Sequence, residues 1–387
     1  MVVQHNLQAM NSNRMLGVTT SSQAKVTEKL SSGYKINRAA DDAAGLSISE
    51  KMRKQIRGLD QASNNAQDGV SAVQTAEGAL AEVHDMLQRM NELAVQAANG
   101  TNSTSDRTAI QNEIDQLTTE IDRVAETTKF NETYLLKGDP KSANTKTVYM
   151  EAHDAGLKGS LSVDEDTHEA TFKPATLNAS DKVMIGGKEY TIVADTDDED
   201  LTASKVHADT AYGYMKDELE KANSIGTASK VTASGTDEFT WTLGTQTVQQ
   251  ALSFNLHVGA DADMTNKIGV NIETMNSAFL GVKGLDVVGD DGIGTQATYA
   301  IDAIADAIQK VSDQRSALGA VQNRLEHTIK NLDNVVENTT AAESQIRDTD
   351  MASTMVEYTK NNILQQAGQS MLAQANQSTQ GVLSLLG

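Results

Sequence analysis

The sequence has no cysteine, and only 2 of its 387 residues are proline. The absence of cysteine excludes a disulfide-stabilised scaffold, a thiolate metal site and a catalytic thiol together. Aromatic residues make up only 4% of the chain, which is typical of thin helical layers held by medium-sized and small side chains. At this length the chain can form two or three domains with a substantial buried core.

Basic charge and long apolar runs are also scarce. The net charge of −21 argues against nucleic acid as a partner, because phosphates would be repelled by such a surface. No run of about 18 apolar residues occurs, so we expect no membrane insertion. Residues 1–13 lack the basic and apolar regions of a signal peptide. If the protein is exported, we expect a route that does not read such a signal.

Apolar or small residues follow a strict alternation of three and four positions in the N-terminal part. These positions are Leu59, Ala62, Ala66, Gly69, Val73, Ala76, Leu80, Val83, Leu87, Met90, Ala94 and Ala97. A seam held at about 3.5 residues predicts a coiled-coil face. Asn99 and Gly100 predict a left-handed cap at the end of this helix, and a second helix is predicted over 106–127.

A matching seam occupies the C-terminal third. Its positions are Ile301, Ile304, Ile308, Val311, Arg315, Leu318, Gln322, Leu325, Ile329, Leu332, Val336 and Thr339. Arg315 and Gln322 are polar breaks, which either fix the register or lie at the seam edge with their polar ends in solvent. We expect the two seams to pack on each other, so that the ends of the chain meet and the middle projects.

The outermost stretches, 2–30 and 351–386, are amphipathic but rich in Asn, Gln, Ser and Thr. Helices this polar gain little from burial alone, so we expect them to be mobile in the monomer and to fold when copies stack. Simple fraying of chain ends would give the same pattern. The candidate polymerisation residues are Leu7, Met10, Leu30, Ile363, Leu364, Met371, Leu372, Leu385 and Leu386.

The middle of the chain changes character between about residues 131 and 295. A hairpin is predicted over 183–193, with Gly186 and Gly187 as its turn. Alternating apolar residues predict strands over 239–243, 254–258 and 268–272, and the spacing from Ala211 to Ala222 predicts a short helix. These elements favour a small β-rich α+β lobe.

Motifs for chemistry are incomplete. His168-Glu169 begins a zinc-protease pattern, but Phe172 stands where the second histidine belongs. The acidic run 195–200 lacks the glycine and the terminal glutamate of a calcium loop. We therefore predict no catalytic, cofactor or metal site, and we do not expect an enzyme.

Several long motifs at both ends resemble bacterial flagellins. They are residues 30–45, 59–69, 87–96, 120–124, 346–350, 363–368, 372–376 and 382–386. The resemblance covers about the first 140 and the last 115 residues, and the middle resembles no family that we can name.

The resemblance implies a mainly α fold of long antiparallel coiled-coil helical domains, with the β-rich lobe inserted between them. The expected inner domain joins 1–45 with 346–387, the expected outer domain joins 46–140 with 275–345, and the variable lobe is 141–274.

The resemblance also implies a function: a structural subunit that polymerises into the extracellular flagellar filament for motility, after unfolded passage through the flagellar type III export channel. The partners it implies are other copies of the chain, the flagellar cap and junction proteins, and a cytoplasmic export chaperone at the C-terminal helix. Toll-like receptor 5 is a further implied partner, at Gln88, Arg89, Leu93 and Glu113. Met90-Asn91 replaces the commoner Val-Arg after Arg89, which removes one positive charge.

Two alternatives stay open at this point. A hook–filament junction protein would share the terminal helices more loosely, and the close match over 30–45 favours the filament subunit. The second alternative is a filament subunit with an enzyme in its middle lobe. The incomplete zinc motif argues against it.

Overall fold

The computed structural model describes residues 6–139, 145–194, 196, 199–225, 233–234, 238–289 and 294–384, with side chains up to residue 377. These residues form two compact units. The first lies within 1–65, 258–266 and 328–387, and the second within 66–257 and 267–327. The three-domain division expected from the sequence stays a prediction.

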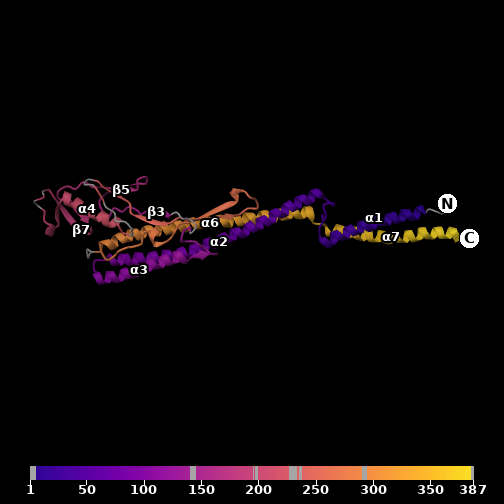
Figure 1. Ribbon diagram of the computed structural model, residues 1–387, viewed down its shortest axis with the longest axis horizontal. Helices are drawn as coiled ribbons and strands as arrows, with labels where there is room; N and C mark the ends of the chain where they lie inside the picture. The colour runs from indigo at the N-terminus through magenta and orange to yellow at the C-terminus, as the bar shows by residue number, and fades with distance from the viewer. Residues whose placement is uncertain are drawn as a thin grey trace. The chain divides into compact units, whose positions relative to one another are not determined.

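Long helices come from both ends of the chain (Figure 1). The N-terminal part forms α1 (Leu7–Ser32), α2 (Ala43–Ala97) and α3 (Thr104–Thr127). The C-terminal part forms α6 (Thr295–Arg347) and α7 (Met351–Ser384). The mainly helical fold that was predicted is therefore confirmed, and the helix expected over 106–127 begins two positions earlier.

The predicted seams form a shared core. Every seam position of α2 from Ala62 to Ala97 is buried. On α6 the buried seam residues recur every seven positions. They are Ile304, Val311, Leu318, Leu325 and Leu332. Residues of α2, α3 and α6 belong to one hydrophobic cluster, so the packing between the ends of the chain is confirmed.

The polar breaks in the C-terminal seam behave differently from each other. Gln322 Nε2 donates to Glu326 Oε1 of its own helix at 3.0 Å, as expected of a residue at the seam edge. Arg315 Nη2 lies 4.0 Å from Glu77 Oε1 of α2. Both members of that pair are more than a third exposed, and such pairs contribute about 0–1 kcal/mol. Apolar packing therefore sets the register of these helices.

The C-terminus of α2 does not have the left-handed cap that was predicted from the sequence. Neither Asn99 nor Gly100 has a positive φ. Instead Arg107, from α3, donates from Nε to Ala97 O at 2.9 Å and from Nη2 to Asn99 O at 3.4 Å. Its side chain is fully buried. A guanidinium at the negative end of the helix dipole satisfies terminal carbonyls that a left-handed turn would otherwise satisfy.

Gly294, immediately before α6, packs against the C-terminus of α2 and the Arg107 side chain. Its φ is +88°, and a Cβ there would lie 3.1 Å from Ala97 O, from Ala98 O and from Arg107 Nη2. We expect Gly294→Ala to destabilise the monomer by about 1–3 kcal/mol in urea denaturation, because the backbone must leave a strained conformation or the α2 terminus must move. The control is Gly319→Ala within α6, where a Cβ meets nothing within 4 Å. A gain of about 0.5–1 kcal/mol is expected there, and equal effects at both positions would contradict this account.

The middle of the chain carries several small sheets. One sheet has the order β4 (Gly159–Asp164), β5 (Glu169–Pro174) and β9 (Phe239–Thr242). A second sheet joins the hairpin of β6 (Lys182–Ile185) and β7 (Lys188–Val193) to β8 (Lys205–His207), which is parallel to β7. The predicted hairpin is confirmed, and both of its turn glycines have positive φ.

Two-stranded antiparallel pairs complete the strands. β3 (Thr145–Tyr149) pairs with β10 (Thr245–Gln249), and β11 (Leu252–His257) pairs with β12 (Lys267–Ile272). β1 (Lys129–Phe130) pairs with β2 (Thr133–Tyr134). The remaining elements are the helices α4 (Ala208–Asn223) and α5 (Ser277–Leu280) and the 3-10 turns at Leu201–Ala203 and Met264–Asn266.

These elements divide between two cores. Residues of β10, β11 and β12, such as Val248, Leu252 and Ile272, belong to the cluster of the long helices. β5, β6, β9 and α4 build a second cluster around Phe172, Phe239 and Met215. Part of the middle region is therefore an extension of the helical core, and part has a core of its own.

Candidate functional site

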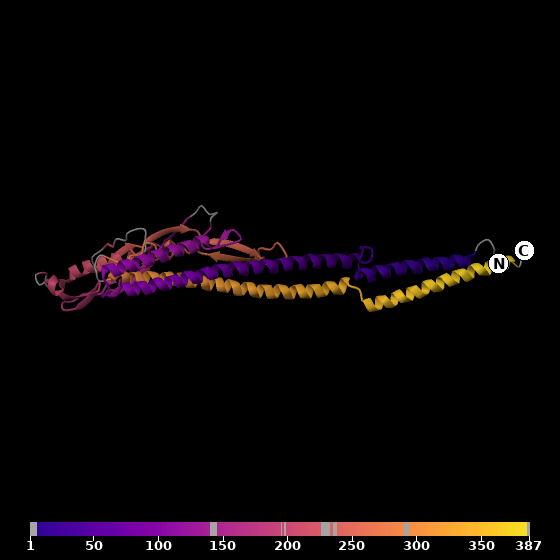
Figure 2. The ribbon, with the colours of Figure 1, turned by 90° about the horizontal axis from the view of Figure 1, so that it is seen from below.

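The contact between α1 and α7 contains small and polar residues of α7 together with some apolar ones, Leu16 of α1 among them. The two helices lie side by side in both views (Figures 1 and 2). On α7, Thr354, Asn361 and Ala375 are buried and Gly368 is half-buried, a repeat of seven positions, and Tyr358, Gln365 and Leu372 are half-buried between them. Asn6 Nδ2 donates to Ala375 O at 3.0 Å, and a Cβ on Gly368 would lie 3.2 Å from Leu16 Cδ1. Leu16 of α1 therefore packs where Gly368 has no side chain.

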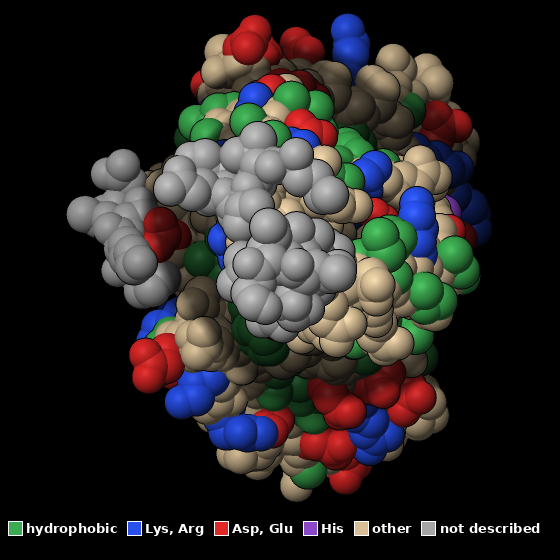
Figure 3. All heavy atoms as spheres, turned by 90° about the vertical axis from the view of Figure 1, so that its right-hand side faces the viewer, with side chains coloured by type: hydrophobic (Ala, Val, Ile, Leu, Met, Phe, Trp, Pro, Cys, Tyr) green, Lys and Arg blue, Asp and Glu red, His purple; other side chains and the backbone are tan. Residues whose placement is uncertain are grey.

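Many large apolar side chains of both helices are nevertheless exposed. Leu7 is 72% exposed, Ile363 is 61% exposed and Met371 is 58% exposed. We call the full set the outward apolar faces: Leu7, Met10, Met15 and Val18 on α1, and Met351, Met355, Val356, Ile363, Leu364 and Met371 on α7. Figure 3, seen from the right-hand side of Figure 1, shows hydrophobic side chains at the surface among charged ones. Apolar surface of this extent marks an interaction site.

Most of the predicted polymerisation residues lie on these faces. Leu7, Met10, Ile363, Leu364 and Met371 are exposed there. Leu30 and Leu372 are half-buried, while Leu385 and Leu386 lie outside the described residues. The sequence list omitted Met15, Val18, Met351, Met355 and Val356. The sequence did contain a signal: the repeat of Thr354, Asn361, Gly368 and Ala375 marks the inner side of α7. The exposed apolar residues lie on the other side of the helix.

A short bridge between two linkers positions α1 and α7. Gly33 ends α1 in a left-handed conformation, and its carbonyl accepts from Thr349 N at 3.0 Å. Lys35 N donates to Arg347 O at 2.7 Å, and the Arg347 guanidinium lies 4.8 Å from the centre of the Tyr34 ring. The stretch 30–45, whose motif resembles flagellins, therefore builds the junction from which both terminal helices start.

The predicted receptor residues divide between surface and core. Arg89 Nη2 lies 2.9 Å from Glu113 Oε1, and this ion pair joins α2 to α3. Hydrogen bonds to Glu113 and then to Glu92 raise the pKa of Arg89 above its ordinary value. Gln88 is exposed beside them, whereas Leu93 is only 2% exposed and lies in the main hydrophobic cluster. Of the four predicted receptor residues, Gln88, Arg89 and Glu113 are therefore at the surface, and Leu93 lies beneath them.

A histidine links the loop after β3 to α6. His153 Nε2 lies 3.2 Å from Asp306 Oδ2. Asn223, at the end of α4, accepts from His153 N and donates to His153 O, both at 2.8 Å. Burial by itself lowers the pKa of His153, but the hydrogen bond to Asp306 and the charges of Asp306, Asp302 and Glu151 raise it overall. The contact with Asp306 thus ties this loop to α6.

This link makes the stability of the chain pH-dependent. Because the pKa of His153 is raised on folding, its stabilising contribution is complete below the ordinary value of 6.5 and is lost as the pH rises through the folded value. We expect His153→Gln to lower the free energy of unfolding by about 0.5 kcal/mol at pH 6 and by less at pH 8.5. Asp302, whose pKa burial raises, interacts with the ring, and Lys310, whose pKa burial lowers, lines the same hollow as His153, so the comparison is always with wild type at the same pH. The exposed His327 supplies the control His327→Gln, which should show no such difference.

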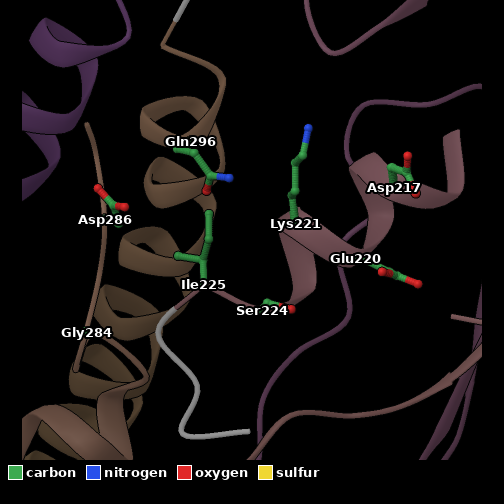
Figure 4. A pocket seen from close by; sticks show the side chains of 8 residues that line it. All are labelled: Asp217, Glu220, Lys221, Ser224, Ile225, Gly284, Asp286 and Gln296. Atoms are coloured by element: carbon green, nitrogen blue, oxygen red, sulfur yellow. The ribbon is translucent and has the colours of Figure 1, made fainter. Parts of the chain in front are cut away.

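A hollow of about 390 Å³ lies between α4 and the start of α6 (Figure 4). Its lining residues are Asp217, Glu220, Lys221, Ser224, Ile225, Gly284, Asp286 and Gln296. No histidine is among them, so this hollow offers no serine–histidine pair for nucleophilic catalysis.

The described residues of the incomplete metal motifs take part in other contacts. His168 has a φ of +54° in the turn before β5 and stacks on Tyr149 with 3.7 Å between ring centroids. In the acidic run, Glu199 accepts from His207 N and Asp200 caps the turn at Leu201, while Asp195, Asp197 and Asp198 lie outside the described residues. Among the side chains that the structure describes, no group of three or more His, Asp or Glu could hold a metal ion.

Comparison with known proteins decides what these helices belong to. A model of the bacterial flagellin N-terminal helical region matches residues 3–141, and a model of the C-terminal helical region matches residues 301–386. A flagellin of Clostridium tyrobutyricum is 44% identical over 98% of this chain and 100% of its own length. The chain belongs to the bacterial flagellin family.

Two further relatives cover the whole chain, including its middle. Flagellins of Halalkalibacterium halodurans and of Bacillus subtilis strain 168 are each 40% identical, over 100% of this chain and 100% of their own length. The resemblance drawn from the terminal motifs is thereby confirmed, and it extends to the region that those motifs left open.

Membership in the flagellin family gives the coarse function. The protein is a structural subunit of the bacterial flagellar filament, an extracellular structure for motility, and it is not an enzyme. As a flagellin it self-assembles. Among the described helices, none combines the length and the apolar character needed to cross a membrane.

Proposed function

We propose that this flagellin polymerises through the outward apolar faces of α1 and α7. One observation carries the proposal: the ten large apolar side chains of the outward apolar faces are exposed to solvent. A monomer gains nothing from this arrangement, since exposed apolar surface is costly in water. A second copy that covers the faces removes that cost.

The free energy available from burying the outward apolar faces is large enough for an assembly contact. Burying one Leu, Ile or Met side chain fully contributes about 1.5–3 kcal/mol. Association costs at least about 4 kcal/mol in lost translational and rotational freedom, so several of the exposed residues must be buried together. A contact of one face with a different face on the next copy repeats without closing, which generates a helical filament.

Seeded polymerisation tests the proposal. Purified monomer mixed with short filament fragments should extend them into long filaments in electron micrographs. Chains trimmed of residues 1–30 or 351–387 should stay monomeric while the core of α2 and α6 keeps its helical circular dichroism. Normal extension by the trimmed chains would overturn the proposal. Intact monomer that caps seeds without extending them would instead favour the junction-protein alternative.

We also infer that Toll-like receptor 5 contacts the surface of Gln88, Arg89 and Glu113. The inference is supported by their shared exposure on two adjacent helices and by the ion pair that fixes the Arg89 guanidinium. Leu93 acts beneath this surface by packing in the core. A cationic fork held in one geometry suits recognition of a carboxylate on a partner.

Replacing Arg89 tests the receptor surface. We expect Arg89→Ala to raise the monomer concentration needed for half-maximal signalling in receptor-expressing reporter cells about tenfold, which is ~1.4 kcal/mol of binding. The control Arg123→Ala removes a comparable exposed arginine of α3, paired with Glu120, and should leave the response unchanged. Equal responses from both variants would remove Arg89 from the contact.

The remaining partners follow from the same faces. We infer that a cytoplasmic export chaperone covers the outward side of α7 before assembly, and that the cap and junction proteins meet the terminal helices at the two ends of the filament. Export unfolded through the flagellar type III channel accords with the absence of cysteine, because no disulfide has to be kept open during passage. Binding of the chaperone to the full chain but not to a chain lacking 351–387 is the expected result.

A further inference from the structure

Methionine is the commonest residue on the outward apolar faces. Five positions carry it: Met10, Met15, Met351, Met355 and Met371, each at least 50% exposed. Among the other exposed large apolar residues that the structure describes, two are methionine, Met184 and Met264. The surfaces through which the monomer is proposed to polymerise are therefore lined by thioether sulfur atoms open to solvent.

An exposed thioether reacts with oxidants that donate an oxygen atom. With hypochlorous acid, the sulfur attacks the oxygen, the O–Cl bond breaks, and a methionine sulfoxide, chloride and a proton result. The sulfur loses two electrons and the chlorine gains them. The product is a polar, chiral side chain, and methionine sulfoxide reductases convert it back to the thioether.

Oxidation changes what the faces can do. A thioether is apolar, flexible and well suited to filling an irregular interface. A sulfoxide oxygen needs a hydrogen-bond donor, and burying it without one costs about 1–3 kcal/mol. Because each subunit carries several such residues, the loss is repeated at every contact along a filament.

We propose that Met10, Met15, Met351, Met355 and Met371 form a reversible oxidation site that controls assembly. Oxygen-donating oxidants such as hypochlorous acid convert them to sulfoxides in the monomer and prevent polymerisation. The assembled filament buries the same sulfur atoms and protects them. This inference rests on the proposed polymerisation through the outward apolar faces.

The chain contains its own reference methionines. Met184 on β6 is 56% exposed and Met264 is 74% exposed, and both lie outside the terminal helices. Met90, Met215 and Met275 are buried. In the monomer, the five face methionines should oxidise as fast as Met184 and Met264, and the buried ones should lag.

Peptide mapping by mass spectrometry, combined with seeded polymerisation, tests the proposal. Monomer and filament are each treated with graded hypochlorous acid and mapped. In filaments the five face methionines should be protected at least about tenfold relative to Met184 and Met264. Oxidised monomer should fail to extend seeds, and treatment with both methionine sulfoxide reductases and a thiol reductant should restore extension.

A fivefold variant identifies which sulfur atoms matter. Met→Leu at the five positions keeps the apolar volume and removes the sulfur, so oxidation should lower the variant's extension rate, relative to its own untreated rate, far less than it lowers that of wild type. Should the fivefold variant not polymerise, the pairs M10L/M15L and M351L/M355L, each expected to give partial resistance, take its place.

The outcomes separate the two proposals. Face methionines that oxidise in filaments as fast as Met264 would overturn the assembly surface itself. Face methionines that are protected in filaments, combined with oxidised monomer that still extends seeds, would overturn only the oxidation control. Loss of extension by an oxidised Met→Leu variant would place the sensitive residue elsewhere, and it too would overturn the inference.

Discussion

We expect Ile363→Asp to weaken filament extension strongly while the monomer stays folded. Ile363 lies on the outward side of α7 and is 61% exposed, so its replacement removes no core contact. At the proposed interface the change removes about 1.5–3 kcal/mol of apolar burial and adds a carboxylate whose desolvation costs several kcal/mol. Since about 1.4 kcal/mol is a factor of ten, the critical concentration for polymerisation should rise at least about a hundredfold.

The measurement is pelleting of filaments across a range of monomer concentrations, with circular dichroism of the soluble chain. Val163→Asp on β4 is the matched control, because Val163 is a comparably exposed aliphatic residue outside the terminal helices. It should polymerise at the wild-type concentration. Ile363→Leu keeps the apolar surface and should do the same. A wild-type critical concentration for Ile363→Asp would remove this part of α7 from the interface.

Arg107→Ala lowers the free energy of unfolding of the monomer by about 2–4 kcal/mol. The side chain is 1% exposed and donates to Ala97 O and Asn99 O. Hydrogen bonds from a charged donor contribute about 1.5–3 kcal/mol, and truncation also leaves a cavity and buried carbonyls without a donor. Few single changes outside an apolar core should destabilise this chain more.

Urea denaturation at a monomer concentration below the polymerisation threshold measures this effect. Arg107→Lys keeps the charge but not the planar fork, so it should lose about half as much stability. Arg123→Ala, which removes an exposed arginine on the same helix, should leave the stability close to that of wild type. An Arg107→Ala variant as stable as the Arg123→Ala variant would show that water satisfies these carbonyls.

The cap that Arg107 provides for α2 could not be predicted from the sequence. Asn99 and Gly100 favour a left-handed cap by local chemistry alone. The carbonyls are instead satisfied by Arg107, which belongs to the next helix. An isolated pattern of residues does not reveal a cap of this kind, because the donor reaches the carbonyls only after α3 has folded back onto α2.

Leu93 shows the same limit at a predicted site. It lies next to the seam position Ala94, and the alternation of threes and fours does not include it. α3 brings a second apolar stripe, with Ile110 and Ile114, into the cluster that contains Leu93. A helix with two partners buries a wider face than a two-helix seam does, so a residue predicted for the surface lies in the core.

The sequence by itself determined the long helices, their pairing and the family. An apolar repeat near 3.5 residues is satisfied only by another helix along its whole length, and the seam from Ala62 to Ala97 is buried as that repeat requires. Tertiary structure alone decided which side of α7 faces inward. Both sides carry a repeat, and the close approach of Leu16 on α1 to Gly368 places the side that contains Gly368 against α1. The large side chains, Ile363 and Met371 among them, are thereby left in solvent, where a second copy can bury them.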